Sequence, residues 1–409
     1  MRDAEGGEVW RRALPVTLEA GPYVLTAELR EGATEDGALV ALGSDELLLV
    51  DWKSRALPAR LALFEKGRAL HRFFEENGKP SPEDFRADMG PLDVIAVGDW
   101  DPEPREPVPA SALALTGCFY RGGTLPPPDV PGGGFPTART TGGALDFEWS
   151  RAEPAPGVGT TDWIARWTGT LTAPESGRYV LHTLSDDGVR VWLDGKLLID
   201  HWDEHGPEYD RADPVELVAG EGHALRVEYF QKDVAATLRL LWTTPARLKA
   251  ADQITDELVH RAQQDGTTVL VLFRADIWAR RLAERGLVQY DGRLDHGRYW
   301  LGGGFVARPH PILNGLPDGA LGRPWQDLVH YGAQRFGLLL SGDEAVIGCV
   351  SGHQFRPATA LGVIPAGKGR IVLSTLDILR TLNGPPGPGD VVRKLFSNLL
   401  SWGAEPASR

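Results

Sequence analysis

The sequence of 409 residues predicts a mixed α/β and all-β protein, in which a doubly wound parallel-sheet domain is interrupted by a β-sandwich domain and preceded by a short β-sandwich piece. Three observations predict this arrangement. Continuous apolar runs alternate with helical patterns in residues 55–103 and again in 247–409, as in a parallel sheet covered by helices. Residues 104–246 carry short runs rich in Trp, Val, Leu and Thr between Gly and Pro. Residues 1–54 contain only two alternating stretches.

The N-terminal piece is expected to be strand-turn-strand. Tyr23–Leu29 follows the turn residues Gly21 and Pro22, and Ala38–Val50 forms the second stretch. Two strands cannot close a core of their own, because isolated hairpins are only marginally stable in water. The piece therefore packs on a neighbour or is the end of a sandwich whose other strands are absent.

The doubly wound domain is expected to begin with the apolar strand Arg60–Glu65 and a helix that stops at Asn77. Leu92–Val97 is a continuous apolar run, typical of a strand buried on both faces. The pattern resumes with a helix at Asp252–Gln264 and a strand at Thr268–Phe273. Without residues 104–246 the order is β-α-β-α-β, which is how right-handed parallel crossovers are built, so this block is predicted to be an insertion in a loop.

Later elements of this domain are expected at Ile277–Arg285 (helix), Gly337–Val350 (hairpin), Gly369–Thr375 (strand) and from the N-cap Asp390 to Gly403 (helix). The inserted block is expected to be a sandwich of two antiparallel sheets. Its strand-like runs are Trp163–Leu171, Gly177–Thr183, Val189–Leu193, Val215–Val218, Ala224–Phe230 and Ala236–Trp242. Tryptophans at strand positions are expected in its core: Trp149, Trp163, Trp167, Trp192 and Trp242.

Composition narrows the classes of partner. The formal net charge of -13 argues against a nucleic-acid or anionic-membrane partner, because either needs clustered Lys and Arg. No stretch has the ~20 consecutive apolar residues of a membrane span. The first ten residues lack the apolar core of a signal peptide, and the compartment stays open. Cys118 and Cys349 show no metal-ligand spacing and are expected to be free thiols.

The split domain resembles the glutamine-amidotransferase-like, flavodoxin-type domain on the C-terminal side of many bacterial family 2 glycoside hydrolases. The matching motifs are Arg308-Pro309-His310-Pro311, Asn314-Gly315-Leu316-Pro317, residues 367–376 and Asn398-Leu399-Leu400. Residues 14–50 look like the final immunoglobulin-like sandwich of such enzymes. The resemblance implies a glycoside hydrolase catalytic domain as partner. The hydrolase's TIM barrel takes ~250 residues, and this sequence has no room for one.

No catalytic residue is predicted. An amidotransferase-like enzyme needs Cys or Ser on a tight strand-to-helix turn. Cys349 instead falls in the predicted late hairpin and is expected to be a core thiol. His310 is expected to be a turn histidine bonded to backbone. Gly367-Lys368-Gly369 is expected to be a tight turn and not a phosphate loop, because the Walker spacing is missing.

The inserted block closely resembles the PA14 (PA-14) module of bacterial glycosidases, proteases and fungal adhesins, which implies carbohydrate binding. The matching stretches are Leu145–Trp149, Ala165–Gly169, Pro174–Tyr179, Ser185–Gly195 and Val227–Phe230.

Asp186 and Asp187 are the residues to which the resemblance assigns metal and sugar binding. Successive side chains of a strand point to opposite faces, so the two carboxylates converge only through an unusual backbone such as a cis peptide, which costs ~3 kcal/mol. Sugar-binding PA14 modules hold such a pair that way around a Ca²⁺ ion, which coordinates vicinal sugar hydroxyls. Where the family has Asn as third ligand, this sequence offers Gln231 and Asp233. The implied metal ligands are Asp186, Asp187 and Asp233. The alternative is a plain Asp turn.

Trp202 and His205 lie in a polar loop after a strand, where an indole could stack on a pyranose ring; the alternative is that Trp202 packs under the turn. The predicted sugar-binding residues are Asp186, Asp187, Trp202, His205, Gln231 and Asp233. We therefore expect a non-catalytic accessory segment that binds oligo- or polysaccharide beside a glycoside hydrolase, with Ca²⁺ as cofactor. Two alternatives stay open: a structural or oligomerisation module, and a hydrolase with an unrecognised nucleophile.

Overall fold

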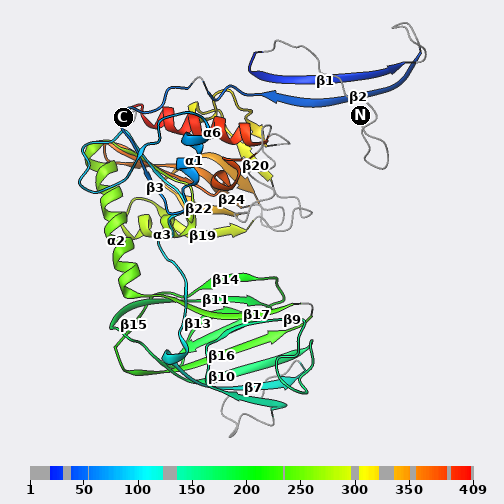
Figure 1. The fold of residues 1–409 in the computed structure, drawn as a ribbon, viewed down its shortest axis with the longest axis vertical. Coiled ribbons are helices and arrows are strands. Elements are labelled where there is room, and N and C mark those ends of the chain that lie inside the picture. Colours follow the sequence, from blue (N-terminus) through cyan, green and yellow to red (C-terminus); the bar gives the residue numbers. More distant parts are fainter. Residues whose placement is uncertain are drawn as a thin grey trace. The chain divides into compact units, whose positions relative to one another are not determined.

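The computed structural model describes residues 19–30, 38–53, 55–122, 136–233, 235–295, 304–321, 336–350, 356–384 and 388–406. It is a mixed, strand-rich structure with several sheets (Figure 1). The chain divides into two compact units, each considered by itself. Unit 1 comprises Met1–Asp101 and Thr255–Arg409, and unit 2 is Pro102–Ile254. No helix in the described ranges is long and apolar enough to cross a membrane.

Five parallel strands form one half of the large sheet of unit 1. They are β3 (Leu61–Phe64), β4 (Glu83–Asp84), β5 (Val94–Val97), β18 (Thr268–Val271) and β25 (Gly369–Ser374). They pair side by side in the order β4-β3-β5-β18-β25. β5 and β18 are therefore neighbours in the sheet although unit 2 lies between them in the sequence.

The other half of this sheet is antiparallel. Its strands are β19 (Gln289–Asp295), β20 (Gly304–Ala307), β21 (Gly319–Ala320), β22 (Phe336–Ser341), β23 (Glu344–Val350) and β24 (Pro357–Ala366). β24 and β25 are joined by the tight turn predicted at Gly367, whose φ is 59°. The predicted hairpin across Gly337–Val350 is wrong in its pairing. Within the described residues, β22 and β23 form no ladder with each other, because β22 pairs mainly with β19 and meets β24 only at Leu338, whereas β23 pairs along its length with β24.

Helices lie on both faces of the parallel strands (Figure 1). They are α1 (Ala69–Glu76), α2 (Pro245–His260, continued by a π turn at Arg261–Asp265), α3 (Ala275–Glu284), α5 (Ile378–Thr381) and α6 (Pro388–Gly403). Phe73 of α1 and Phe396 of α6 meet edge to face, with 5.2 Å between ring centres. α1 stops at Asn77 as predicted. α6 begins two residues before the expected N-cap, with Pro388 in its first turn, where proline is well tolerated.

The predicted N-terminal sandwich piece is a single antiparallel hairpin in the residues that the structure describes. β1 (Gly21–Arg30) pairs with β2 (Leu39–Leu49) in the register Gly21↔Leu49. No third strand joins these two among the described residues. Residues 14–18 and 31–37 of the predicted piece lie outside the described ranges.

Cys349 and His310 of unit 1 are held in the fold by burial and by a backbone hydrogen bond, respectively. The Cys349 side chain is buried in the core, and this burial raises the pKa of its thiol to about 12. The Nδ1 atom of His310 accepts a hydrogen bond from the Ile312 N–H at 3.1 Å, as expected for a turn histidine. Both features favour a structural role, because a nucleophilic cysteine needs a lowered pKa and access to substrate.

We expect Cys349 to stay unlabelled by iodoacetamide in the folded protein at about pH 8, because the thiolate is the reactive form and the raised pKa suppresses it. Cys118, which is partly exposed, should react first. Timed labelling followed by peptide mass analysis measures both rates, and Cys118→Ser should remove the fast phase. Fast modification of Cys349 would instead revive the hydrolase alternative.

Unit 2 is a sandwich of two antiparallel sheets, as predicted. Its strands are β6 (Glu106–Pro107), β7 (Leu113–Arg121), β8 (Ala138–Thr141), β9 (Asp146–Ser150), β10 (Trp163–Thr172), β11 (Gly177–Asp186), β12 (Val189–Leu193), β13 (Lys196–His201), β14 (Glu208–Arg211), β15 (Val215–Leu217), β16 (Gly222–Gln231) and β17 (Ala236–Thr243). One sheet has the order β13-β12-β16-β10-β7-β8 and the other β14-β11-β17-β6, with β15 beside β11 and β9 beside β17.

The core of unit 2 lies between these sheets and is built of leucine, alanine, aromatic and β-branched side chains. Trp163, Trp167 and Trp242 are buried, as expected. Trp149 is partly buried and meets Trp163 edge to face at 5.1 Å. Trp192 is also only partly buried, but it does not pack against this core, and the Arg226 guanidinium covers its ring at 3.8 Å.

Candidate functional site

Asp186 and Asp187 lie at the end of β11, and the peptide bond between them is cis, as the family resemblance implied. Both residues are buried, with exposed fractions of 8% and 6%. The next residue is Gly188, where a Cβ atom would lie 2.2 Å from Cε1 of Phe230. Glycine is therefore needed here because the Phe230 ring lies against the backbone directly after the acidic pair.

The Asp187 carboxylate ties two loops together. Its Oδ1 atom accepts the backbone N–H of His205 at 3.1 Å, and its Oδ2 atom accepts that of Lys232 at 2.8 Å. One loop follows β13 and the other follows β16. Hydrogen bonds to a charged acceptor are among the stronger ones in proteins, so this carboxylate fixes the relative position of the two loops.

Negative charge is concentrated around Asp186. Burial raises the pKa of its carboxyl group, the Asp187 and Asp233 carboxylates raise it further, and His205 lowers it. The pKa of the Tyr229 hydroxyl is also raised, first by burial and then by the two carboxylates. A dication bound beside these groups would favour their ionised forms. Carboxylate oxygens are donors that suit a hard cation such as Ca²⁺, but among the described residues the Asp186, Asp187 and Asp233 carboxylates do not form a close cluster.

The buried side chain of Gln231 stabilises the loop that follows β16. Its Oε1 atom lies 2.7 Å from the Tyr229 hydroxyl, and its Nε2 atom donates to the backbone oxygens of Asp233 and Ala235, the latter at 2.9 Å. The residue is 1% exposed. Because both ends of its amide are engaged within the domain, Gln231 positions the loop that carries the exposed Asp233.

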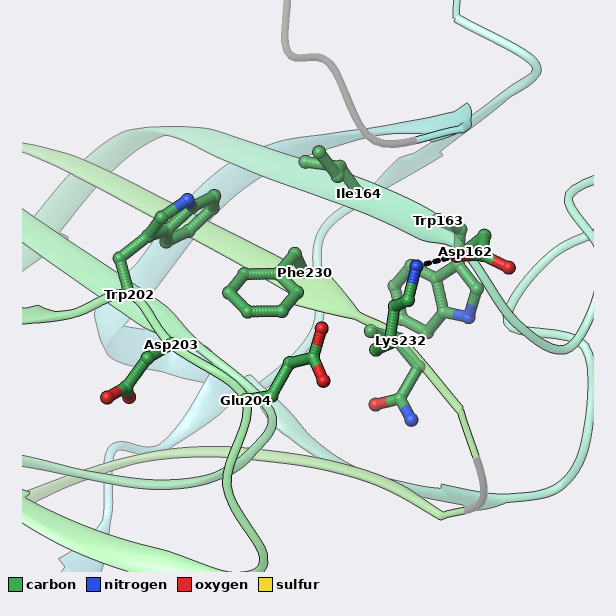
Figure 2. A pocket seen from close by; sticks show the side chains of 9 residues that line it. Asp162, Trp163, Ile164, Trp202, Asp203, Glu204, Phe230 and Lys232 are labelled. Carbon is green, nitrogen blue, oxygen red and sulfur yellow. Dashed lines mark hydrogen bonds and ion pairs between the residues drawn. The ribbon is translucent and has the colours of Figure 1, made fainter.

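A pocket with a volume of about 460 Å³ opens between these loops. Its lining residues are Asp162, Trp163, Ile164, Trp202, Asp203, Glu204, Phe230, Gln231 and Lys232. Trp202 and Phe230 form an aromatic wall, with ring centres 4.9 Å apart in an edge-on arrangement (Figure 2). Lys232 reaches across to Asp162 at 2.8 Å. The pocket thus combines an apolar wall with charged groups that can donate or accept hydrogen bonds.

Trp202 combines the two roles that the sequence left open. It is half-buried, it packs on Phe230, and the Arg190 guanidinium lies 4.8 Å from its ring centre, yet it also lines the pocket. His205 is fixed by its backbone bond to Asp187 and is not among the lining residues.

Several residues that line the pocket were not predicted from the sequence. Ile164 and Phe230 were assigned to strands without a site role, and Asp162, Glu204 and Lys232 were not singled out. The signal available was the spacing of Phe230 and Lys232 around Gln231, since alternate residues of a strand share a face. Asp162 reaches the pocket only because β10 and β16 pair in the folded protein, with Trp163 at the start of β10 opposite Gln231 of β16.

Part of the chain is similar to a known protein family. The family model described as PA14 domain matches residues 111–256. The anti-sigma-I factor RsgI3 of Acetivibrio thermocellus is 34% identical over 105 residues, which are 26% of this chain and only 16% of that relative.

Two solved structures are also similar to parts of the chain. One is described as an anti-sigma factor domain-containing protein, with 29% identity and a TM-score of 0.29, covering 33% of this chain and 44% of the other. Another is described as the PA14 sugar-binding domain from an RTX adhesin, with 18% identity and a TM-score of 0.27, covering 32% of this chain and 88% of the other.

Proposed function

We propose, starting from the PA14 domain at residues 111–256, that this chain binds glycan in the pocket between the loops after β13 and β16. We further propose that Asp186, Asp187 and Asp233 hold a Ca²⁺ ion. The observation that carries the proposal is the buried, cis-linked acidic pair whose second carboxylate holds both pocket-lining loops. The carboxylates of Asp186, Asp187 and Asp233 are not among the lining residues, but Asp187 bonds to the backbone of Lys232, which is, so a cation at the pair would lie beside the pocket wall.

The pocket chemistry supports a sugar as the ligand. A pyranose has apolar C–H faces and polar edges, and an indole side chain offers an apolar surface for such a face. Trp202 and Phe230 provide that surface here. Glu204, Lys232 and Asp162 provide hydrogen-bonding groups around it. Ca²⁺ accepts 6–8 oxygen ligands, so three carboxylates leave positions for sugar hydroxyls.

Calorimetric titration with Ca²⁺, followed by a glycan panel with and without chelator, tests this proposal. We expect stoichiometric Ca²⁺ binding and glycan retention that the chelator removes. Trp202→Ala should keep Ca²⁺ affinity but weaken glycan binding about tenfold, because an aromatic contact contributes on the order of 1 kcal/mol. Equal binding with and without Ca²⁺ would remove the ion from the proposal. Absence of all glycan binding would favour the structural module, which a concentration-dependent oligomer would then support.

We further propose that unit 1 is a doubly wound, flavodoxin-type domain and that the whole chain serves as an accessory segment of a glycoside hydrolase. Numbered along the chain, its five parallel strands lie in the order 2-1-3-4-5, which is the flavodoxin order, and this supports the first part. The second part depends on the sequence motifs of residues 308–317 and 367–376. Co-sedimentation with polysaccharide, with and without the hydrolase, would test it.

A further inference from the structure

His201, Asp203 and His205 form a cluster that the Ca²⁺ proposal does not use. One potential ligand atom from each of the three lies within 4.8 Å of the others. The His201 Nε2 atom is 3.0 Å from Oδ1 of Asp203, and the two imidazole rings are stacked with centres 3.9 Å apart. We propose that these three residues bind a transition-metal ion of the zinc type at the rim of the pocket.

Hydrogen bonds orient both imidazoles for this role. The Nδ1 atom of His205 lies 2.7 Å from the Gly206 carbonyl oxygen, which can only accept, so Nδ1 carries the proton. The Nδ1 atom of His201 lies 3.0 Å from the Asp210 carboxylate. In His205 Nε2 is then the atom with a free lone pair, whereas in His201 Nε2 is the atom that faces the Asp203 carboxylate at 3.0 Å. A histidine that donates its other N–H to a carboxylate or carbonyl is the usual arrangement at a metal.

The His205 Nε2 atom supplies an independent observation. It is buried, and it has no hydrogen-bond partner among the described residues. A buried polar atom without a partner costs about 1–3 kcal/mol and needs an explanation. A metal ion bound to this lone pair supplies one, and Asp203, which is exposed and lines the pocket (Figure 2), completes the ligand set.

The donor set determines the class of ion. Two imidazole nitrogens and one carboxylate oxygen suit Zn²⁺, Co²⁺, Ni²⁺ or Cu²⁺, whereas Ca²⁺ and Mg²⁺ prefer oxygen ligands alone. Three protein ligands leave a fourth position of a tetrahedral ion open. The two proposed sites share no ligand, so Zn²⁺ binding and Ca²⁺-dependent glycan binding are tested by different variants, although the backbone N–H of His205 bonds to Asp187 and its ring acts on Asp186.

Zinc titration of the untagged protein by calorimetry tests the inference. We expect one saturable Zn²⁺ site, and a Co²⁺ form whose visible spectrum is that of a four- or five-coordinate ion. Asp210→Asn should weaken Zn²⁺ binding roughly 10- to 100-fold, as expected for an outer-shell partner. His205→Gln should weaken it at least as much.

Two variants serve as controls. His223→Gln alters a second histidine with a buried Nε2, whose Nδ1 pairs with Asp194 at 2.8 Å. No third ligand gathers with these two among the described residues, so the variant should leave Zn²⁺ affinity unchanged. Asp186→Asn should lower Ca²⁺ affinity and leave Zn²⁺ affinity unchanged. The inference is overturned if no saturable Zn²⁺ binding occurs, or if His205→Gln binds Zn²⁺ as tightly as the unaltered protein. His201 would then only bridge the Asp203 and Asp210 carboxylates.

Discussion

Replacing Asp187 with alanine should abolish Ca²⁺ binding and Ca²⁺-dependent glycan retention together. The substitution removes a proposed metal ligand, and it also leaves the backbone N–H groups of His205 and Lys232 without their acceptor. A hydrogen bond to a charged group contributes about 1.5–3 kcal/mol, so both pocket loops lose a substantial restraint. Calorimetry measures the loss of Ca²⁺ binding, and hydrogen exchange of residues 202–206 and 230–233 measures the loss of loop order.

Asp194→Ala is the matched control for that substitution. The Asp194 carboxylate also accepts two hydrogen bonds, from the backbone N–H of Ala224 at 2.7 Å and from His223 at 2.8 Å, but it does not line the pocket. We expect this variant to bind Ca²⁺ and glycan normally. If Asp187→Ala retained glycan as well as Asp194→Ala does, the acidic pair would be a turn and nothing more. Asp187→Asn should be intermediate in loop order, because its amide oxygen still accepts one hydrogen bond.

The elements with strong local patterns were those that the sequence predicted well. The buried strands β5 and β18 are continuous apolar runs, and α1 and α6 have a regular apolar face and clear end residues. β13 and β14 were missed because they are mostly exposed at the margins of their sheets, and polar side chains are common on edge strands. β24 was missed because it contains Pro357 and Pro365, residues that argue against a central strand.

Of the candidate site, the acidic pair and the glycine after it could be predicted from the sequence, but the pocket could not. Asp186, Asp187 and Gly188 are adjacent in sequence, so the resemblance locates them directly. The pocket needs residues from β10, the loop after β13 and the loop after β16, and no local pattern encodes that meeting. Gln231 illustrates the limit: its residue type suggested a sugar-binding residue, and it does line the pocket, but its contacts with Tyr229, Asp233 and Ala235, which hold the loop, could not be predicted.

A buried ion pair next to the pocket residues Ile164 and Phe230 should have the largest effect on stability. Arg166 of β10 and Glu228 of β16 face each other across the two strands, with Nε and Oε1 2.9 Å apart. Their side chains are only 7% and 9% exposed. We expect Glu228→Gln to lower the free energy of unfolding of unit 2 by about 3–5 kcal/mol, because it leaves the Arg166 charge buried without a counter-charge.

Denaturant titration of the full chain, followed by hydrogen exchange in peptides of β10 and β16, measures this loss within unit 2. Glu148→Gln is the control. Glu148 pairs with Arg239 at 3.1 Å but is 63% exposed, and an exposed pair contributes at most about 1 kcal/mol. Arg166→Met combined with Glu228→Leu should recover most of the stability, because replacing both charges leaves no buried ion without a partner. If the double variant were as unstable as Glu228→Gln, the loss would arise from packing between β10 and β16 and not from the unpaired charge.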